Sequence, residues 1–304
     1  MEIVVSFVTI NYNGLKDTCT LIESIPQDEA LEIIVVDNAS MNDEASTIVS
    51  RYPYVKVIRS DSNLGFAGGN NLGIKAAQGK FLFFVNNDTE FRWNSDEERG
   101  SSFLQPLIDS LESAPDIGIV CPKLRFAWGS NPIQFAGFTP LSPITLRNKT
   151  IGLGEEDHGQ HDTPHPTPYA HGAAMLVKRE ALEKVGLMPE CYFLYYEELD
   201  WSEMFRRAGY SIWYDPCLSV YHKESQTTGQ SSPLRTYYMT RNRLLFAKRN
   251  INAPKRYLTY SYLILIVNLR DIAKYIFKRQ SNLVKAALTG ICDFLKGRQG
   301  YHSF

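Results

Sequence analysis

The sequence is organised around the stretch Lys80-Phe81-Leu82-Phe83-Phe84-Val85-Asn86-Asn87-Asp88-Thr89-Glu90. Its five apolar residues are too few for a helix and predict a strand buried on both faces. Asn86, Asn87 and Asp88 follow at once and would lie at the carboxyl edge of a sheet, where open α/β folds bind ligands. Oxygen ligands at this edge suit Mg2+ or Mn2+. A plain turn is the alternative, because Asn and Asp dominate turns.

The composition is that of a folded protein. The chain has 304 residues, 44% of them hydrophobic and 12% aromatic, and a net charge of -1 that gives no support to a nucleic-acid partner. Its five cysteines form no Cys-x-x-Cys pair, so neither a disulfide framework nor a zinc site is indicated. The N-terminus has no basic start and no small-residue cleavage site, so we expect no signal peptide and a cytoplasmic location.

Strand and helix patterns alternate three times before residue 80. This alternation is typical of a parallel, Rossmann-like sheet. The ends of such strands share one edge, so the side chains of Asn11, Asp37 and Asp88 are expected to meet there. The predicted strands are residues 3–10, 32–36 and 55–58, and the predicted helices are residues 16–24 and 43–51.

A glycine-rich segment, residues 63–73, separates the third strand from the central one. Its glycines allow close backbone approach, and a helix starting near Ala67 would aim free N–H groups at an anion. The segment matches neither the Gly-x-Gly-x-x-Gly fingerprint nor a P-loop, which disfavours dinucleotide dehydrogenases and nucleotide triphosphatases. A glycine-rich turn that serves helix–strand packing is the alternative.

The pattern is weaker after residue 90. Residues 126–168 are rich in Pro, Gly and His and predict a binding loop or an accessory hairpin. Its histidines, His158, His161 and His165, are expected to be solvated rather than a metal cluster, because no helix orients them. Other predicted elements are a loop and helix at 96–113, strands at 117–122 and 169–178, a helix at 179–185, and short strands at 212–215 and 218–222.

Two further groups have open interpretations. Glu197, Glu198 and Asp200 stand after an aromatic run, at the start of a helix expected to reach Ala208. They either complement the helix dipole, or one of them is a general base whose pKa is raised by apolar surroundings. His222, at a strand end, is either a metal ligand or a polar core residue.

In order, these motifs resemble the family 2 inverting glycosyltransferases of the GT-A fold, in particular rhamnosyltransferase-like members that build bacterial surface polysaccharides. The resemblance implies an α/β GT-A domain over residues 1–240, with a Rossmann-like, mostly parallel sheet and flanking helices, followed by a basic amphipathic helical extension over residues 241–304. The motifs that carry it are VTINYN at 8–13, VVDNAS at 35–40, NLGFAGGNN at 63–71, VNND at 85–88, GAAM at 172–175, FLYYEELD at 193–200 and YMTRN at 238–242.

The resemblance also implies a donor site. Asp37 would accept the N3–H of the nucleotide base, and Asp88 would hold Mg2+ or Mn2+ on the donor diphosphate with His222 as a further ligand. Asn86 stands where the Asp-x-Asp motif of the family has an acid, which lowers the negative charge of the site. The remaining nucleotide-binding residues would be Thr9, Asn11, Asn63, Asn86 and Asn87.

Catalytic and acceptor roles follow from the same resemblance. Glu198 would take the proton of the acceptor hydroxyl, and Glu197 is the alternative base because the family usually has Glu-Asp here. Trp201 would line the acceptor side or the core. Arg241 would contact a diphosphate of donor or acceptor, or lie on a basic helix surface.

The implied function is metal-assisted transfer of a sugar, rhamnose in the first instance, from a dTDP- or UDP-sugar to a lipid-linked or polysaccharide acceptor. A catalytically weak nucleotide-sugar-binding module in a polysaccharide assembly complex is the alternative, motivated by Asn86 and Glu198. A nucleotidyltransferase is disfavoured, because residues 11–16 offer one glycine and one lysine where a glycine-rich basic loop is needed.

The C-terminal part is strongly basic. Residues 241–304 contain thirteen Lys and Arg against two acids, Asp271 and Asp293, which leaves +11. The apolar run at 257–269 falls short of the roughly 18 to 20 residues of a bilayer span. Basic and apolar residues together predict helices that lie on the inner surface of the membrane. A helical hairpin packed on the main domain is the alternative.

Overall fold

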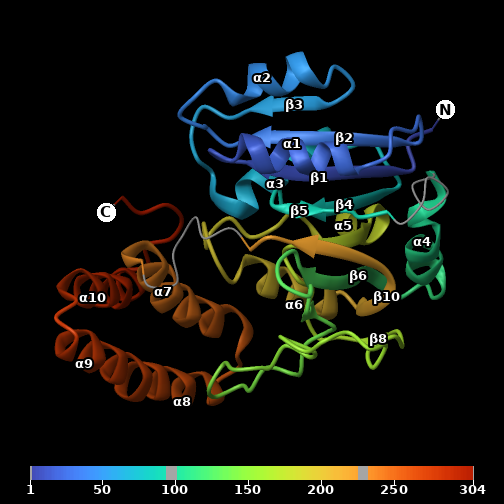
Figure 1. Cartoon of the computed structure of the whole chain (residues 1–304). Coiled ribbons are helices and arrows are strands. Elements are labelled where there is room, and N and C mark those ends of the chain that lie inside the picture. Colours follow the sequence, from blue (N-terminus) through green and yellow to red (C-terminus); the bar gives the residue numbers. More distant parts are fainter. Residues whose placement is uncertain (1, 94–100, 225–231, 304) are drawn as a thin grey trace.

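The computed structural model describes residues 2–93, 101–224 and 232–303. A ten-stranded sheet with helices on both faces forms the main body, and a helical extension lies beside it (Figure 1). The strands are β1 (Val5–Asn11), β2 (Leu31–Asp37), β3 (Lys56–Arg59), β4 (Phe81–Val85), β5 (Thr89–Glu90), β6 (Ile117–Phe126), β7 (Ile133–Phe135), β8 (His165–Pro166), β9 (Ala174–Lys178) and β10 (Ser211–His222).

The sheet has a parallel half and a mixed half. Its order is β3-β2-β1-β4-β9-β6-β10-β5, with β7 on β6 and β8 on β10. Strands β1 to β4 are parallel where they pair, which confirms the predicted Rossmann-like arrangement. Strand β9 is antiparallel to both β4 and β6. The carboxyl ends of β1, β2 and β4 therefore share one edge, and the turn before β9 reaches the same edge.

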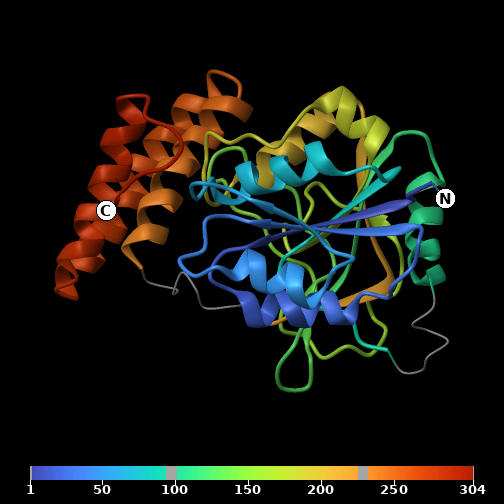
Figure 2. The ribbon, with the colours of Figure 1, turned by 90° about the horizontal axis from the view of Figure 1, so that it is seen from above.

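Helices cover both faces of the sheet. Figure 2 shows α1 and α2 on one face and α3 and α6 on the other, so the central strands are shielded from water. The helices are α1 (Leu15–Ser24), α2 (Glu44–Arg51), α3 (Gly65–Ala76), α4 (Gln105–Glu112), α5 (Arg179–Val185), α6 (Glu197–Arg207), α7 (Pro233–Asn250), α8 (Lys255–Tyr262), α9 (Leu269–Phe277) and α10 (Ser281–Leu295), with a 3-10 turn at Ser101–Leu104 and a π-helical segment at Leu263–Asn268.

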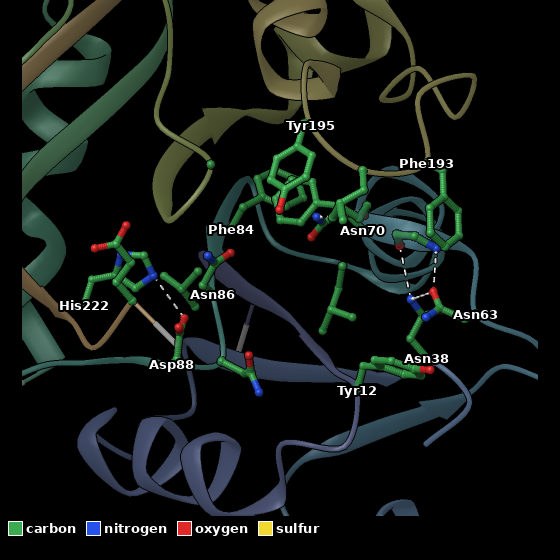
Figure 3. A pocket seen from close by; sticks show the side chains of 18 of the residues that line it. Tyr12, Asn38, Asn63, Asn70, Phe84, Asn86, Asp88, Phe193, Tyr195 and His222 are labelled. Carbon is green, nitrogen blue, oxygen red and sulfur yellow. Dashed lines mark hydrogen bonds and ion pairs between the residues drawn. The ribbon is translucent and has the colours of Figure 1, made fainter. Parts of the chain in front are cut away.

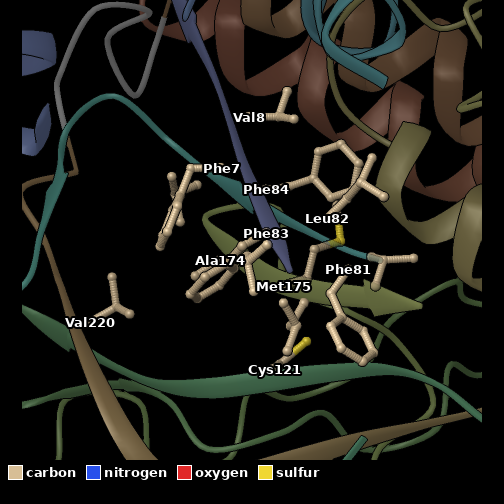
Figure 4. Packing of buried hydrophobic residues seen from close by; sticks show 14 of the residues in the cluster. Phe7, Val8, Phe81, Leu82, Phe83, Phe84, Cys121, Ala174, Met175 and Val220 are labelled. Atoms are coloured by element: carbon tan, nitrogen blue, oxygen red, sulfur yellow. The ribbon is translucent and has the colours of Figure 1, made fainter. Parts of the chain in front are cut away.

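Strand β4 lies at the centre of the core, as its five apolar residues predict. All five are buried, and their side chains alternate between the two faces (Figure 4). Phe83 packs on Phe7 with ring centroids 5.3 Å apart, and Phe84 meets Trp201 edge-on at 5.6 Å. This packing fixes the strand whose end carries Asn86, Asn87 and Asp88.

The second half of the sheet differs from the pattern-based expectation. The two short strands predicted at 212–215 and 218–222 are one strand, β10, whose pairing with β6 shifts register between Asp215 and Ser219. The predicted loop at 126–168 contains β7 and β8. The helix expected within 96–113 is α4, and residues 96–100 of that prediction lie outside the described residues.

The extension is built on helix α7. Its N-cap, Ser232, accepts a hydrogen bond from the Arg235 backbone N–H at 3.2 Å, and the helix runs through the predicted domain boundary at residue 240. Helix α10 packs closely on α7 at Gly290, where a Cβ would lie 2.9 Å from the Tyr237 carbonyl oxygen. Across the three described ranges no helix has both the length and the hydrophobicity that a bilayer crossing needs.

Candidate functional site

A cavity of about 1190 Å3 lies at the sheet edge where the parallel strands end (Figure 3). Three groups of residues line it. Asn38 and Asn63 stand at one end, and Asp88 and His222 stand at the other. The loop at 193–195 forms part of the wall between them. The cavity is therefore where the predicted ligand-binding edge of the sheet opens to solvent.

Strand pairing brings Asp88 and His222 together from opposite parts of the chain. In the antiparallel pair β5–β10, His222 stands opposite Thr89, the residue after Asp88. The Nε2 atom of His222 lies 3.1 Å from Oδ1 of Asp88, and both side chains are largely buried. The Lys223 backbone N–H donates to the Asp88 carbonyl oxygen at 2.9 Å. The two residues predicted as metal ligands thus face each other at the cavity.

Gln134 of β7 determines which nitrogen of His222 carries a proton. Its Oε1 lies 2.8 Å from Nδ1 of His222, and both residues are buried. An amide oxygen only accepts, so Nδ1 is the donor. In a neutral imidazole, the lone pair of Nε2 then points at the carboxylate of Asp88. Two acceptor atoms face each other, and a cation or a proton between Nε2 and the carboxylate would bind both. Nothing in the sequence around Gln134 signals this contact.

His171 stands close to this pair. Burial, with a smaller effect from His222, lowers the pKa of His171 to about 3, so the ring is neutral at physiological pH. It stacks on Phe138, and its Nδ1 accepts the Ala173 N–H at 3.1 Å, which holds the turn before β9. In the described part of the chain, no group of three His, Cys, Asp or Glu side chains forms a metal cluster, and this includes the loop histidines.

The residues predicted around the base are divided between the cavity and the interior. Thr9, Asn11 and Asp37 are fully buried beneath the cavity floor and do not line it. Asn11 donates to Oδ1 of Asp37 at 3.0 Å and accepts from Thr18 Oγ1 at 2.7 Å. Among the described residues, the second carboxylate oxygen of Asp37 has no hydrogen-bond partner, and neither does the hydroxyl of Thr9.

Asn38 and Asn63 form the polar end of the cavity. Asn38 Nδ2 donates to Oδ1 of Asn63 at 3.1 Å, and the same oxygen accepts the Gly65 N–H at 2.8 Å (Figure 3). The Phe66 N–H donates to the Phe193 carbonyl oxygen at 3.0 Å. The first amides of α3 are therefore used by the protein, which corrects the expectation that this helix start aims free N–H groups at an anion.

Gly65 explains the glycine at this position. Its φ is +72°, and a Cβ would lie 2.1 Å from the Phe193 carbonyl oxygen, so only glycine fits beneath the loop. Asn86 and Asn87 line the cavity as predicted. Asn87 Nδ2 donates to Thr18 Oγ1 at 3.1 Å, which links the end of β4 to α1.

Glu197 and Glu198 start helix α6 behind Gly172, a lining residue. Glu197 is 2% exposed, and its Oε2 has no hydrogen-bond partner in the part of the chain that the structure describes. Burial, and next to it the charge of Glu198, raises the pKa of Glu197 well above the ordinary value. Glu198 is partly exposed, and burial raises its pKa as well. A Cβ on Gly172 would lie 3.7 Å from Cγ of Glu198, so this side chain lies against the cavity wall.

The loop before α6 has a strained backbone. Phe193, Tyr195 and Tyr196 have φ values of +68°, +69° and +80°, which non-glycine residues rarely adopt. Asn242 holds this loop, because its Nδ2 lies within hydrogen-bond distance of the carbonyl oxygens of Tyr192, Leu194 and Tyr195, at 2.7 to 3.0 Å.

Arg241 and Trp201 lie away from the cavity. Arg241 is 1% exposed and donates to the carbonyl oxygens of Tyr192 at 2.7 Å and Gly300 at 2.8 Å. Trp201 is fully buried, and its Nε1 donates to the Gly186 carbonyl oxygen at 2.9 Å. Of the two positions expected for Trp201, it takes the core one, and Arg241 holds the loop rather than facing the cavity.

Several lining residues were not singled out from the sequence. Asn38 belongs to the motif VVDNAS and follows β2 directly, so its position at a strand end could have predicted that it lines the cavity. Tyr12, Phe66 and Asn70 also belong to quoted motifs, whereas the remaining lining residues carry no such signal. Among them are Trp128, Lys223 and Arg235.

Comparison with known proteins bears on this geometry. The family model described as Glycosyl transferase family 2 matches residues 6–186. The chain is 24% identical, over 97% of its length and 92% of the relative, to the low-salt glycan biosynthesis hexosyltransferase Agl10 of Haloferax volcanii. It is 25% identical, over 68% of its length and 71% of the relative, to the N-acetylglucosaminyl-diphospho-decaprenol L-rhamnosyltransferase of Mycobacterium tuberculosis.

A solved structure has the same fold. The mannosyltransferase PcManGT from Pyrobaculum calidifontis, solved in complex with GDP-Man and Mn2+, superposes with a TM-score of 0.56 at 15% sequence identity. The match covers 98% of this chain and 89% of that chain. The mixed sheet with its flanking helices is accordingly a GT-A fold.

Proposed function

The chain belongs to glycosyl transferase family 2 and is an inverting glycosyltransferase, and from this premise we propose what it transfers and how. It moves a sugar from a nucleotide-diphosphate donor to a lipid-linked saccharide, with Asp88 and His222 as the metal ligands. The observation that carries the proposal is their 3.1 Å approach at one end of the cavity that Asn38 and Asn63 line at the other.

The nucleotide lies at the Asn38 and Asn63 end. Tyr12 lines the cavity and is 44% exposed, which gives the base an aromatic face to stack on. The unpartnered Oδ2 of Asp37 is the acceptor for the N3–H of the base. Because this oxygen is buried, the ends of β1 and β2 would have to move for the base to reach it, and an unpaired buried acceptor gains from such a partner.

The residues at the other end fit a divalent cation. A carboxylate oxygen and an imidazole nitrogen suit Mn2+, and Mg2+ sites commonly use one or two protein ligands together with substrate phosphates. The lone pair that Gln134 leaves on Nε2 of His222 points to the same place. When bound, the ion neutralises negative charge on the leaving diphosphate. The amide of Asn86 is neutral, so Asp88 supplies the negative charge of this ligand pair.

Glu198 acts as the general base. The acceptor hydroxyl oxygen attacks the anomeric carbon, the bond from that carbon to the diphosphate oxygen breaks, and the hydroxyl proton passes to Glu198. Its raised pKa makes it a stronger base than an exposed glutamate. Glu197 is a weaker candidate, because it is buried and lies behind Glu198.

The finer assignments are the donor sugar and the acceptor. Rhamnose as the sugar and an acceptor with a polyprenyl diphosphate are supported by the name of the mycobacterial relative, at 25% identity. The nucleotide that we propose as the carrier of rhamnose is dTDP. A UDP-linked hexose is the competing donor. We also propose that the protein works at the inner face of the cell membrane, where such an acceptor is found.

The experiment is a thermal-shift screen of nucleotide sugars with and without Mn2+, followed by a transfer assay on polyprenyl-linked saccharides. We expect dTDP-rhamnose to raise the melting temperature more in the presence of Mn2+. Asp88→Asn should remove the Mn2+-dependent part, and Asp61→Asn, an exposed control, should not. Stabilisation that never depends on Mn2+ would contradict the metal assignment. Donor binding without any transfer would favour the catalytically weak binding module.

A further inference from the structure

Helix α9 has an apolar face that no described element covers. Leu269, Ile272, Ala273, Ile276 and Phe277 lie on one side of the helix at 100° per residue. None of the residues of α9 is buried, and Leu269, Ile276 and Phe277 are 55%, 62% and 90% exposed. Amphipathic helices normally bury such a face, so this one is available for a partner.

The exposed apolar face continues along the neighbouring segments. The inner side of the π-helical segment is occupied, because Leu263 and Val267 are buried against Leu244 and Leu245 of α7. Its outer side carries Leu265 and Ile266. We call the whole set the outer apolar face, formed by Tyr257, Leu258, Leu265, Ile266, Leu269, Ile276 and Phe277, each at least 55% exposed.

Basic side chains border the outer apolar face. Arg270 and Lys274 of α9 and Lys278 at its C-cap are exposed and follow one another at intervals of four, so they form a row beside the apolar residues. In the sequence from 255 to 280 the one acid is Asp271, and it pairs with Arg270 at 2.7 Å. The row therefore keeps a net positive charge.

We propose that the outer apolar face and its basic row bind the surface of a bilayer that contains anionic lipid. Apolar side chains would enter the boundary between headgroups and acyl chains, and the lysines would contact anionic headgroups. A second copy of the chain is a poorer partner, because a symmetric contact would place two positive rows against each other. A membrane supplies both the apolar phase and the opposite charge.

The position of the face agrees with a lipid-linked acceptor, and to this extent the inference rests on the proposed function. Leu234 and Arg235, in the first turn of α7, line the cavity, and the same helix carries the extension. Figure 1 shows the extension beside the edge of the sheet where β2 and β3 end. A membrane bound there would hold the acceptor near the cavity.

The test is co-sedimentation of the full chain with vesicles of phosphatidylcholine alone or mixed with phosphatidylglycerol, without any donor. We expect binding to the anionic vesicles that weakens in high salt. Ile276→Asp with Phe277→Asp should weaken it at least tenfold, and Lys274→Glu with Lys278→Glu about tenfold. The matched controls are Val49→Asp, 49% exposed on α2, and Lys75→Glu, exposed on α3. Both should bind as the wild type does.

Three other outcomes would reject the inference. Equal binding to both vesicle types removes the charge requirement, and unchanged binding of the Ile276 and Phe277 variant removes the face. A dimer in solution that this variant abolishes would make a second copy the occupant. Vesicle binding is read without donor, so it can succeed where sugar transfer fails. Loss of transfer with intact vesicle binding would reject the proposed function alone.

Discussion

Two regions at the cavity, the Asp88 and His222 end and the loop before α6, use their polar side chains in opposite ways. At the Asp88 and His222 end, polar side chains face the cavity, and the nitrogen and oxygen atoms that meet there are both suited to accept a cation. At the loop before α6, Arg241 and Asn242 are buried and donate hydrogen bonds to backbone carbonyl groups. A polar residue of a family motif is thus a ligand candidate only where its side chain faces the cavity.

This difference separates chemistry from scaffold. We expect residues that face the cavity to be changed with less loss of stability than Arg241 and Asn242, because they bind fewer backbone groups of the loop before α6. These two residues hold the strained φ values of Phe193, Tyr195 and Tyr196, so changing them should unfold the cavity wall. The predictions below test that separation.

The largest effect is expected for Glu198→Gln, at a residue beside the cavity. We predict a loss of about a thousandfold in transfer rate, because the acceptor hydroxyl loses its base, with donor affinity nearly unchanged. The melting temperature should not fall. Glu183→Gln, exposed on α5, is the control and should keep full activity. An active Glu198→Gln together with an inactive Glu197→Gln would move the base to Glu197.

The wild-type pH profile sharpens the same assignment. Because burial raises the pKa of Glu198 above 4.5, its base form is lost at a higher pH than for an exposed glutamate. The acidic limb of the transfer rate should therefore lie above pH 4.5.

The next largest effect is expected for Arg241→Met, at a residue whose side chain is bonded to backbone carbonyl groups. Removing the guanidinium takes away its hydrogen bonds to the carbonyl groups of Tyr192 and Gly300, and the Tyr192 carbonyl keeps only the Asn242 amide. We therefore expect a loss of about 3 kcal/mol in the free energy of unfolding. Urea denaturation measures it. Lys248→Met, exposed on the same helix, should change stability by less than about 0.5 kcal/mol. Normal stability with lost donor affinity would restore Arg241 to a ligand-binding role.

The same contrast explains how far the sequence could predict this molecule. The parallel half of the sheet follows from short local patterns, and Asp88, with its neighbours Asn86 and Asn87, was placed correctly at its edge. The antiparallel insertion of β9 between β4 and β6 depends on pairing between distant segments. Arg241 was expected at a diphosphate or on a surface, because arginine is seldom fully buried, and no local pattern reveals the carbonyl groups that hold it.

Gln134 belongs to neither group alone, because its buried hydrogen bond orients His222, which faces the cavity. Gln134→Leu should weaken Mn2+ affinity about tenfold, measured by calorimetry in the presence of a nucleoside diphosphate, since His222 loses the bond that directs Nε2 to Asp88. Gln134→Glu keeps an acceptor at Nδ1 and should restore much of the affinity. Leu and Glu variants with equal affinity would mean that Gln134 only fills space.

The smallest effect concerns Glu197, a buried acid with an unpartnered oxygen. Its pKa is raised in the folded protein, so the folded state holds a proton that the unfolded state releases above pH 4.5. This contribution to stability is complete below that pH and is lost as the pH rises toward the folded-state pKa. The wild type should therefore lose stability between pH 5 and 7 through this group, and Glu197→Gln should remove that part of the slope.

Glu198 titrates beside Glu197, so the pH slope has two sources that the variants separate. Urea denaturation at several pH values, on Glu197→Gln and on Glu198→Gln, assigns the slope to each group. If Glu197 is scaffold and Glu198 is chemistry, Glu197→Gln should change the slope more and the transfer rate less. If the free energy of unfolding depends on pH equally in the wild type and in Glu197→Gln, Glu197 keeps its charge in the folded protein. It would then have a partner for that charge, and we would group it with the residues that face the cavity.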